Sequence, residues 1–298
     1  MKVISVFNQK GGVGKTTSVV NLAVALSFLD KKVLVIDIDP QANTTTGLGL
    51  DKNNIDNSLY ELFYAGEVDE EASLDEIVID ETSNEDDETS ENVSAEVDEP
   101  EQVEIEVDIH EYITKTKSGV DLIASESALS GLEVELVDLD PLERTGQLKD
   151  ILKLLEPDEY DYILIDCPPS LGLLSVNALV ASNSIIIPIQ TEYYALEGVS
   201  ELMNTFNLVK QQLNPDLEIE GVLLSMFDKR TLLSYEVVEE VKSFFKTKVF
   251  KVMIPRNPRL AEAPSHGLST IEYDHKSPGA IAYITLAREI IDNEREGK

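Results

Sequence analysis

Residues 3 to 17 read VISVFNQKGGVGKTT, in which a run of β-branched and apolar residues precedes a glycine-rich turn that ends in lysine and threonine. The apolar run predicts a buried strand, and the residues after Lys15 predict a helix. Gly11, Gly12 and Gly14 allow the backbone to curl with its N–H groups facing inward, as binding of phosphate oxygens requires. We therefore predict a phosphate-binding loop; the alternative is a glycine-rich turn that only connects a strand to a helix.

The residue types in this turn indicate which ligand the loop would hold. Lys15 would neutralise the β and γ phosphates, and the Thr16 hydroxyl would coordinate Mg²⁺. The start of the following helix would add its dipole. ATP and Mg²⁺ are the expected cofactors. The candidate ATP-binding residues of this loop are Lys10, Gly11, Gly12, Val13, Gly14, Lys15, Thr16 and Thr17.

Short runs rich in valine and isoleucine recur along the rest of the chain, with helix-length segments between them. The expected strands are 3–7, 33–37, 120–124, 162–166, 185–189, 221–225 and 249–254. The expected helices are 17–29, 146–155, 196–213 and 234–246. Because strands alternate with helices and are apolar along most of their length, we predict an α/β fold with a doubly wound, mostly parallel sheet covered by helices on both faces.

Length and composition favour one domain with an acidic insertion. The chain has 298 residues, 42% of them apolar, so we expect residues 1–298 to form a single domain. Residues 67–108 contain 20 aspartates and glutamates and no lysine or arginine. Such a segment has little capacity to form a core, and we expect a solvated, partly disordered insertion. Alternating apolar residues at its end fit one face of a strand, and a negative arm that repels DNA or receives a basic partner is the functional alternative.

The single cysteine and the hydropathy pattern limit the class of protein. Cys167 alone cannot form an internal disulfide or a multi-thiolate metal site, which indicates a reducing cytoplasm and disfavours a metallocluster reductase. No apolar stretch reaches 18 residues, so we expect no membrane span. The formal net charge of -33 argues against a nucleic-acid partner, but residues 229–259 have eight lysines and arginines against three glutamates.

Carboxylates follow two of the expected strands directly. Asp37 and Asp39 lie in VLVIDIDPQANTT (33–45), and Asp166 lies in YILIDCPPSLG (162–172). Ligands of open α/β sheets bind at the carboxyl ends of the strands, so these side chains are candidates for the Mg²⁺ surroundings and for holding a water molecule. The alternative is that the first pair caps the next helix.

Further motifs give the chain a family resemblance. Gln9 stands where the general phosphate-loop pattern has glycine, and Lys10 follows it, which gives the KGGxGKT form of the loop. This form of the loop is typical of one branch of the P-loop ATPases. Within that branch the chain resembles the Soj-type ParA proteins more than MinD, iron proteins or arsenic-pump ATPases. Its other matching segments are PSLGLLSVNAL (169–179), Q-x-EYYALEG (190–198), GVLLSMFDKRT (221–231) and IPRNPRLAEAPSHG (254–267).

The resemblance implies roles for individual residues. Lys10 would reach the nucleotide bound by the other subunit of an ATP sandwich dimer, and Asp39 would orient the attacking water. Asp37 and Asp166 would lie in the second shell of the Mg²⁺. The catalytic candidates are thus Lys10, Lys15 and Asp39, and the candidates near the adenine are Met226, Asp228, Pro255, Arg256 and Asn257.

The resemblance also implies a partitioning function with partners. ATP would close a homodimer, the dimer would bind nucleoid DNA without sequence preference, and a ParB-type partner would trigger hydrolysis. The candidate DNA contacts are Lys210, Lys229 and Arg230, while Asn207 stands where relatives often have arginine. Two alternatives remain open. The first is a nucleotide-switched scaffold that positions a protein cargo without DNA. The second is a MinD-like ATPase of the membrane surface, which would need an amphipathic helix at the C-terminus that the segment LAREIIDNEREGK does not supply.

Overall fold

The computed structural model describes residues 1–65, 107–193 and 198–297. The chain divides into two units, of which the first consists of Met1–Phe63 and Asp108–Lys298 and the second of Tyr64–Val107. The fold below is that of the first unit. The acidic insertion expected at 67–108 lies outside the described residues, apart from its last two positions.

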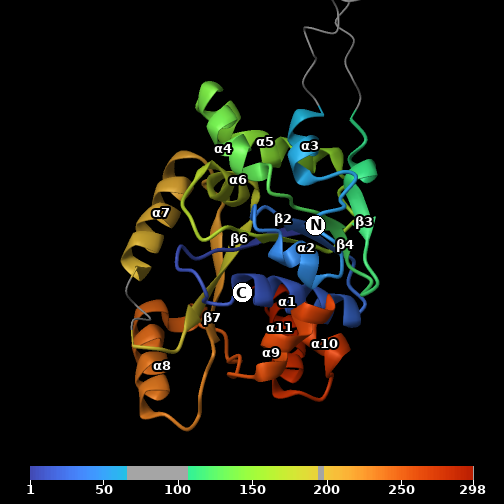
Figure 1. The fold of residues 1–298 in the computed structure, drawn as a ribbon. Helices are drawn as coiled ribbons and strands as arrows, with labels where there is room; N and C mark the ends of the chain where they lie inside the picture. Colours follow the sequence, from blue (N-terminus) through green and yellow to red (C-terminus); the bar gives the residue numbers. More distant parts are fainter. Residues whose placement is uncertain (66–106, 194–197, 298) are drawn as a thin grey trace, which may run out of the picture. The chain divides into compact units, whose positions relative to one another are not determined.

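A seven-stranded sheet forms the centre of the first unit within the described residues (Figure 1). Its strand order is β3-β4-β2-β5-β1-β6-β7, and every pairing is parallel except that of β3 with β4. The strands are β1 (Lys2–Val6), β2 (Val33–Asp37), β3 (Ile113–Lys115), β4 (Asp121–Ile123), β5 (Tyr162–Asp166), β6 (Ser184–Gln190) and β7 (Glu218–Ser225). The doubly wound, mostly parallel sheet predicted from the sequence is therefore confirmed.

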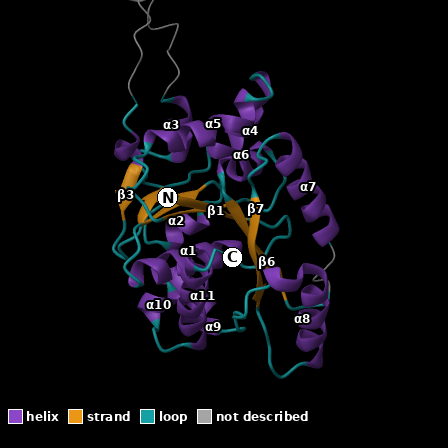
Figure 2. Cartoon of the chain, turned by 180° about the vertical axis from the view of Figure 1, so that it is seen from behind, coloured by secondary structure: helices purple, strands orange, loops and turns teal. Residues whose placement is uncertain are grey.

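Helices cover both faces of this sheet (Figure 2). On one face lie α1 (Lys15–Phe28), α9 (Pro258–Glu262), α10 (Thr270–Tyr273) and α11 (Pro278–Arg295). On the other lie α4 (Leu129–Glu135), α5 (Glu143–Ile151), α6 (Leu173–Ala181) and α7 (Val199–Gln212). The remaining helices are α2 (Asn43–Gly47), α3 (Leu59–Tyr64) and α8 (Leu232–Phe245), and short 3-10 turns span Ile109–Tyr112, Leu136–Asp138, Leu152–Leu154, Lys246–Lys248 and Ala263–His266.

The apolar runs form strands because both faces of the sheet are covered. All five residues of β2 and of β5 are buried, including the aspartate that ends each of them. The helix α1 is buried along Ser18–Leu26, since it packs between the sheet and α11. The core therefore lies directly beneath the loop that joins β1 to α1, and this arrangement fixes the position of the glycine-rich turn.

One expected strand is wrong. Residues 249–254 form only an isolated bridge between Val249 and Val222 of β7, with two further hydrogen bonds to that strand. The backbone N–H groups of Lys251 and Val252 instead donate to the carboxylate of Glu289 on α11, at 2.8 and 3.2 Å. A side-chain acceptor thus competes with the sheet for this segment, and the apolar pattern gave no sign of it. The three-residue edge strand β3 was not foreseen either, because so short a run has no readable period.

Candidate functional site

The glycine-rich turn forms an open cradle between β1 and α1. Gly12 and Gly14 have φ of 75° and 95°, which side-chain-bearing residues rarely adopt, and Gly14 precedes the first turn of α1. A Cβ atom built on Gly11, Gly12 or Gly14 would have no other heavy atom within 4 Å. The space beside the backbone is therefore large enough for a ligand as bulky as a phosphate.

Two neighbouring strands hold this cradle in place. The Asn8 Nδ2 group donates to the carbonyl oxygen of Pro188 on β6 at 2.8 Å, and Asn8 Oδ1 accepts from the backbone N–H of Lys10 at 3.0 Å. The hydroxyl of Ser225, at the end of β7, donates to the carbonyl oxygen of Val13 at 2.8 Å. These contacts keep the loop at the carboxyl edge of the sheet, where open α/β folds bind ligands.

Lys15 is buried in the loop, with 7% of its surface exposed. Its ammonium donates to the carbonyl oxygen of Lys10 at 3.3 Å. Burial lowers the pKa of Lys15, and the nearby carboxylates of Asp166 and Asp39 oppose that shift. A buried cation at a glycine-lined cradle suits an anionic ligand, because the anion would restore the electrostatic stabilisation that water no longer provides.

Asp166 joins the phosphate loop to the loop after β2. Its Oδ2 atom accepts hydrogen bonds from the hydroxyls of Thr16 and Thr44, both at 2.7 Å. Its Oδ1 atom is buried and has no hydrogen-bond partner in the part of the chain that the structure describes. Burial raises the pKa of Asp166. A buried carboxylate with one unused oxygen beside a threonine hydroxyl fits the surroundings of a hydrated Mg²⁺.

Asp37 and Asp39 differ in what their carboxylates contact. Asp37 is fully buried and pairs in register with Asp166 on the neighbouring strand β5. It accepts from the N–H and the hydroxyl of Thr45, both at 2.8 Å, and from the N–H of Asp39 at 3.3 Å. Burial and the charge of Asp166 raise the pKa of Asp37. Among the described residues, the Asp39 carboxylate accepts a hydrogen bond only from the N–H of Gln41, at 3.0 Å, so one of its two oxygens takes none.

The segments expected near the adenine lie against each other. Phe227 pairs with Pro255 in an isolated parallel bridge, and the N–H of Arg256 donates to the carbonyl oxygen of Phe227 at 3.0 Å. Met226 has φ of 53° and receives a contact from the side-chain amide of Gln190. Asn257 caps α9 through its Oδ1 atom, while its Nδ2 atom is buried without a partner among the described residues. The cluster adjoins the phosphate loop because Ser225, which bonds Val13, directly precedes Met226.

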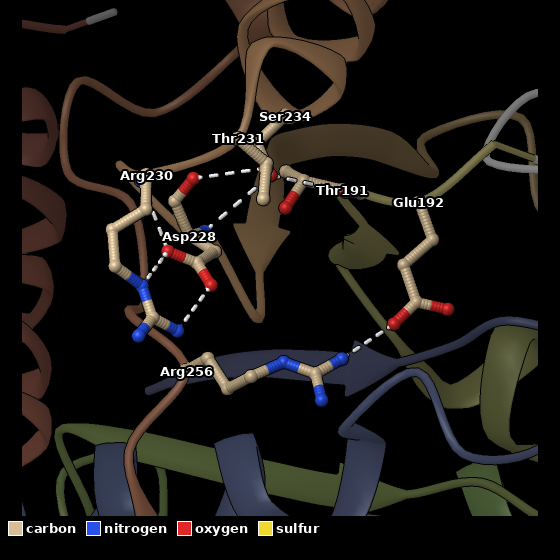
Figure 3. Close-up of polar contacts among 7 residues, drawn as sticks. All are labelled: Thr191, Glu192, Asp228, Arg230, Thr231, Ser234 and Arg256. Carbon is tan, nitrogen blue, oxygen red and sulfur yellow. Dashed lines mark hydrogen bonds and ion pairs between the residues drawn. The ribbon is translucent and has the colours of Figure 1, made fainter.

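Two ion pairs occupy charged side chains of this cluster (Figure 3). Arg230 forms a two-pronged contact with Asp228, with N–O distances of 2.9 and 2.7 Å, and these hydrogen bonds lower the pKa of Asp228. The Arg256 guanidinium donates to the Glu192 carboxylate at 2.6 Å. Arg230 nevertheless remains 80% exposed, so the edge of its guanidinium away from Asp228 faces solvent.

The other cations expected to contact DNA are not equivalent. The ammonium of Lys210 donates to the carbonyl oxygen of Leu217 at 2.7 Å and lies 3.7 Å from the carboxylate of Glu218. Lys229 is exposed, and no ion pair of its side chain is found among the residues that the structure describes. Asn207 on α7 is exposed as well. Several basic residues of 229–259 also pair with carboxylates, namely Lys242 with Glu239, Lys248 with Glu218 and Arg259 with Glu262.

Three residues of the site were missed from the sequence: Thr44, Thr45 and Ser125. Thr44 and Thr45 follow the Asp-Pro-Gln segment and bond the carboxylates of Asp166 and Asp37. Ser125 follows β4 and donates to the carbonyl oxygen of Asp39 at 2.6 Å. The signal available was position: Ser125 is a small hydroxyl residue just beyond the carboxyl end of β4, and the two threonines begin the helix that follows β2.

Comparisons with known proteins identify the family. The family model described as an AAA domain matches residues 1–219. The sporulation initiation inhibitor protein Soj of Bacillus subtilis is 45% identical over 292 residues, covering 98% of this chain and 99% of that protein. The chain belongs to the ParA/Soj family of partitioning ATPases. The chromosome partitioning protein ParA of Myxococcus xanthus is 43% identical over 294 residues, with 98% of this chain and 89% of that protein covered.

Solved structures agree with this membership of the ParA/Soj family. Cobyrinic acid a,c-diamide synthase from Mycobacterium smegmatis, solved with ADP and magnesium, superposes with a TM-score of 0.75 at 30% identity, over 100% of this chain and 97% of that one. The cell division ATPase MinD of Pyrococcus furiosus superposes with a TM-score of 0.68 at 25% identity, over 98% of both chains.

These comparisons identify the activity. The chain is an ATPase that uses ATP and Mg²⁺, and its relatives make it a partitioning ATPase. Among the described residues, no helix has the length and apolar character that a membrane span requires.

Proposed function

We propose that the chain is an ATP-driven switch for DNA partitioning. ATP closes a homodimer, and the homodimer binds DNA without sequence preference. A ParB-type partner then stimulates hydrolysis, which releases the protein from the DNA. The nucleotide-binding part of this proposal is best supported by the Asp166 carboxylate. It accepts hydrogen bonds from the hydroxyls of Thr16 on α1 and Thr44 on α2. A nucleotide that recruits Thr16 would alter this shared contact and could thereby control which surface the protein presents. The expected location is the cytoplasm, on the nucleoid.

The cradle would hold the triphosphate and the residues around it would supply the chemistry. Lys15 and the N–H groups of Gly11–Thr16 would bind the β and γ phosphates. Mg²⁺, when bound, supplies charge neutralisation at the phosphate oxygens; Thr16 would be its direct ligand, while Asp37 and Asp166 would lie in its second shell. Asp39 would accept a hydrogen bond from the attacking water and so orient it, since one of its carboxylate oxygens takes no hydrogen bond from the described residues.

The outer side of the loop supports the proposed dimer. Lys10 is exposed, and its backbone alone makes hydrogen bonds to the residues that the structure describes. A lysine held by its backbone on an exposed loop beside the cradle can extend toward a second molecule. Lys10 would in this way reach the nucleotide bound by the partner subunit.

DNA contact is proposed for the surface that carries Lys229 and Arg230, with Lys210 contributing less. Non-specific binding needs cations that reach phosphates, and Arg230 is the most exposed arginine of the site cluster. Lys210 is held by Leu217 and Glu218, so a phosphate would have to displace these contacts.

Replacing Arg230 tests this surface. We expect Arg230→Ala to weaken retention on DNA-cellulose in the presence of ATP and to reduce the slope of log affinity against log salt by about 0.9, as loss of one phosphate contact predicts. ATP affinity should stay unchanged. Arg295→Ala is the matched control, since Arg295 is 74% exposed on α11 and, among the described residues, pairs only with Asp292, at 4.0 Å. Equal retention of Arg230→Ala and the wild type across the salt series would contradict the assignment.

A nucleotide-switched scaffold for a protein cargo is the second candidate. It is favoured by the net charge of -33, by the exposed Asn207 and by the carboxylates paired with Lys210, Lys242 and Lys248. DNA retention measured with ATP, with ADP and without nucleotide separates the two functions. Retention that requires ATP and falls with salt supports the DNA switch, whereas no retention at low salt with ATP supports the scaffold.

A further inference from the structure

Ser125 connects β4 to the turn that carries Asp39. It lies two residues beyond β4 and is fully buried. Its hydroxyl donates to the carbonyl oxygen of Asp39 at 2.6 Å, and its backbone N–H donates to the hydroxyl oxygen of Thr45 at 3.0 Å. One residue therefore contacts the beginning and the end of the segment 39–45.

The turn that starts at Asp39 is held in an unfavourable backbone conformation. The carbonyl oxygen of Asp39 also accepts the N–H of Ala42 at 2.9 Å, which closes the turn. Ala42 has φ of 53° and is buried. Residues with a Cβ rarely adopt such angles unless surrounding contacts enforce them. The Ser125 hydroxyl is one of these contacts, because it fixes the carbonyl from which the turn begins.

The far end of the segment is fixed through the same serine. Thr45, which accepts from the Ser125 N–H, donates its hydroxyl to Asp37 at 2.8 Å. The N–H of Asp39 donates to the other oxygen of Asp37. Asp37, Thr45, Ser125 and Asp39 thus form a closed ring of contacts that spans β2 and β4.

Ser125 itself has little freedom to move. The carbonyl oxygen of the preceding residue, Ala124, accepts the N–H of Leu59 at 2.8 Å. The carboxylate of the following residue, Glu126, accepts the hydroxyl of Ser58. Both contacts come from the start of α3, so the residues on either side of the serine are held by a third element.

From this arrangement we infer that Ser125 is a positioning residue for Asp39 and sets where that carboxylate meets the attacking water. The inference rests on the water-orienting role proposed above for Asp39. A group that orients a reactant must be held to within about 0.5 Å, and the residues that hold it need not touch the reactant. Ser125 holds the Asp39 backbone, while the Gln41 N–H orients the carboxylate itself.

The main variant is Ser125→Ala, which removes the hydroxyl and keeps the backbone bond to Thr45. We expect single-turnover hydrolysis to slow about tenfold, as the loss of one buried hydrogen bond at the turn predicts. The dissociation constant for ATP should stay within about twofold, because no phosphate contact is removed. Ser182→Ala is the matched control, since Ser182 is nearly as buried and donates at 2.7 Å to a carbonyl of its own helix, that of Ala178. It should hydrolyse ATP at the wild-type rate.

A double-mutant cycle distinguishes positioning from general support. If Ser125 acts through Asp39, Ser125→Ala should have no effect on the residual rate of Asp39→Ala. The same fold loss in both backgrounds, or a wild-type rate for Ser125→Ala alone, would overturn the inference. A wild-type rate for Asp39→Ala would instead overturn the role proposed for Asp39. Should the alanine variant fail to fold, Ser125→Cys keeps the volume with a weaker donor, and the same cycle applies with a smaller loss.

Discussion

Lys15→Ala is expected to abolish measurable ATP binding. The lysine is the buried cation of the glycine cradle, and an ammonium that bridges two phosphates makes charge-assisted hydrogen bonds worth about 1.5 to 3 kcal/mol each. Losing two of them raises the dissociation constant by at least about a hundredfold. Isothermal titration calorimetry with ATP and Mg²⁺ measures this change directly.

Folding of the Lys15→Ala variant should be preserved. Burial lowers the pKa of Lys15, which means that the folded protein without ligand holds this charge at a cost. Its recorded hydrogen bond is a single 3.3 Å contact with the Lys10 carbonyl oxygen. Without nucleotide, the Lys15→Ala variant should therefore unfold at about the same temperature as Lys149→Ala. Lys149 is an exposed lysine on α5. Wild-type heats of ATP binding in the folded Lys15→Ala variant would remove the basis of the proposed nucleotide site.

The glycine-rich turn and most of the strand segments could be predicted because local sequence determines them. Gly12 and Gly14 occupy positions where φ is positive, and few residues other than glycine fit there. The aspartates end strands whose apolar runs are long enough to recognise, and parallel strands bring such ends to one edge. The side chain of Asp166 lies at this edge and accepts a hydrogen bond from the Thr16 hydroxyl.

Contacts between distant segments could not be predicted. Ser125 and Asp39 are separated by 86 positions, and nothing in either sequence segment requires a hydroxyl at the end of β4. The ion pair between Arg256 and Glu192 has the same origin, because the segment before α9 meets the loop after β6. The expected strand at 249–254 was wrong for a related reason, since Glu289 on α11 takes its N–H groups.

Asp39→Ala is expected to slow hydrolysis by about a hundredfold or more, because the attacking water loses the group that orients it, while ATP binding and ATP-dependent dimerisation persist. The Asp39 carboxylate accepts one hydrogen bond from the described residues, that of the Gln41 N–H, so its removal costs little folding stability. Phosphate release under single-turnover conditions reports the rate, and light scattering with ATP reports the dimer. Hydrolysis at the wild-type rate would contradict the assignment.

The neighbouring aspartate supplies the comparison that makes this result specific. Asp37 accepts three hydrogen bonds from Thr45 and Asp39 and is fully buried, so Asp37→Ala leaves several buried donors without an acceptor. That variant should unfold at a lower temperature as well as hydrolyse slowly, whereas Asp39→Ala should lose only the rate. The two measurements would then distinguish the roles of the two carboxylates: Asp37 holds the loop, and Asp39 orients the attacking water.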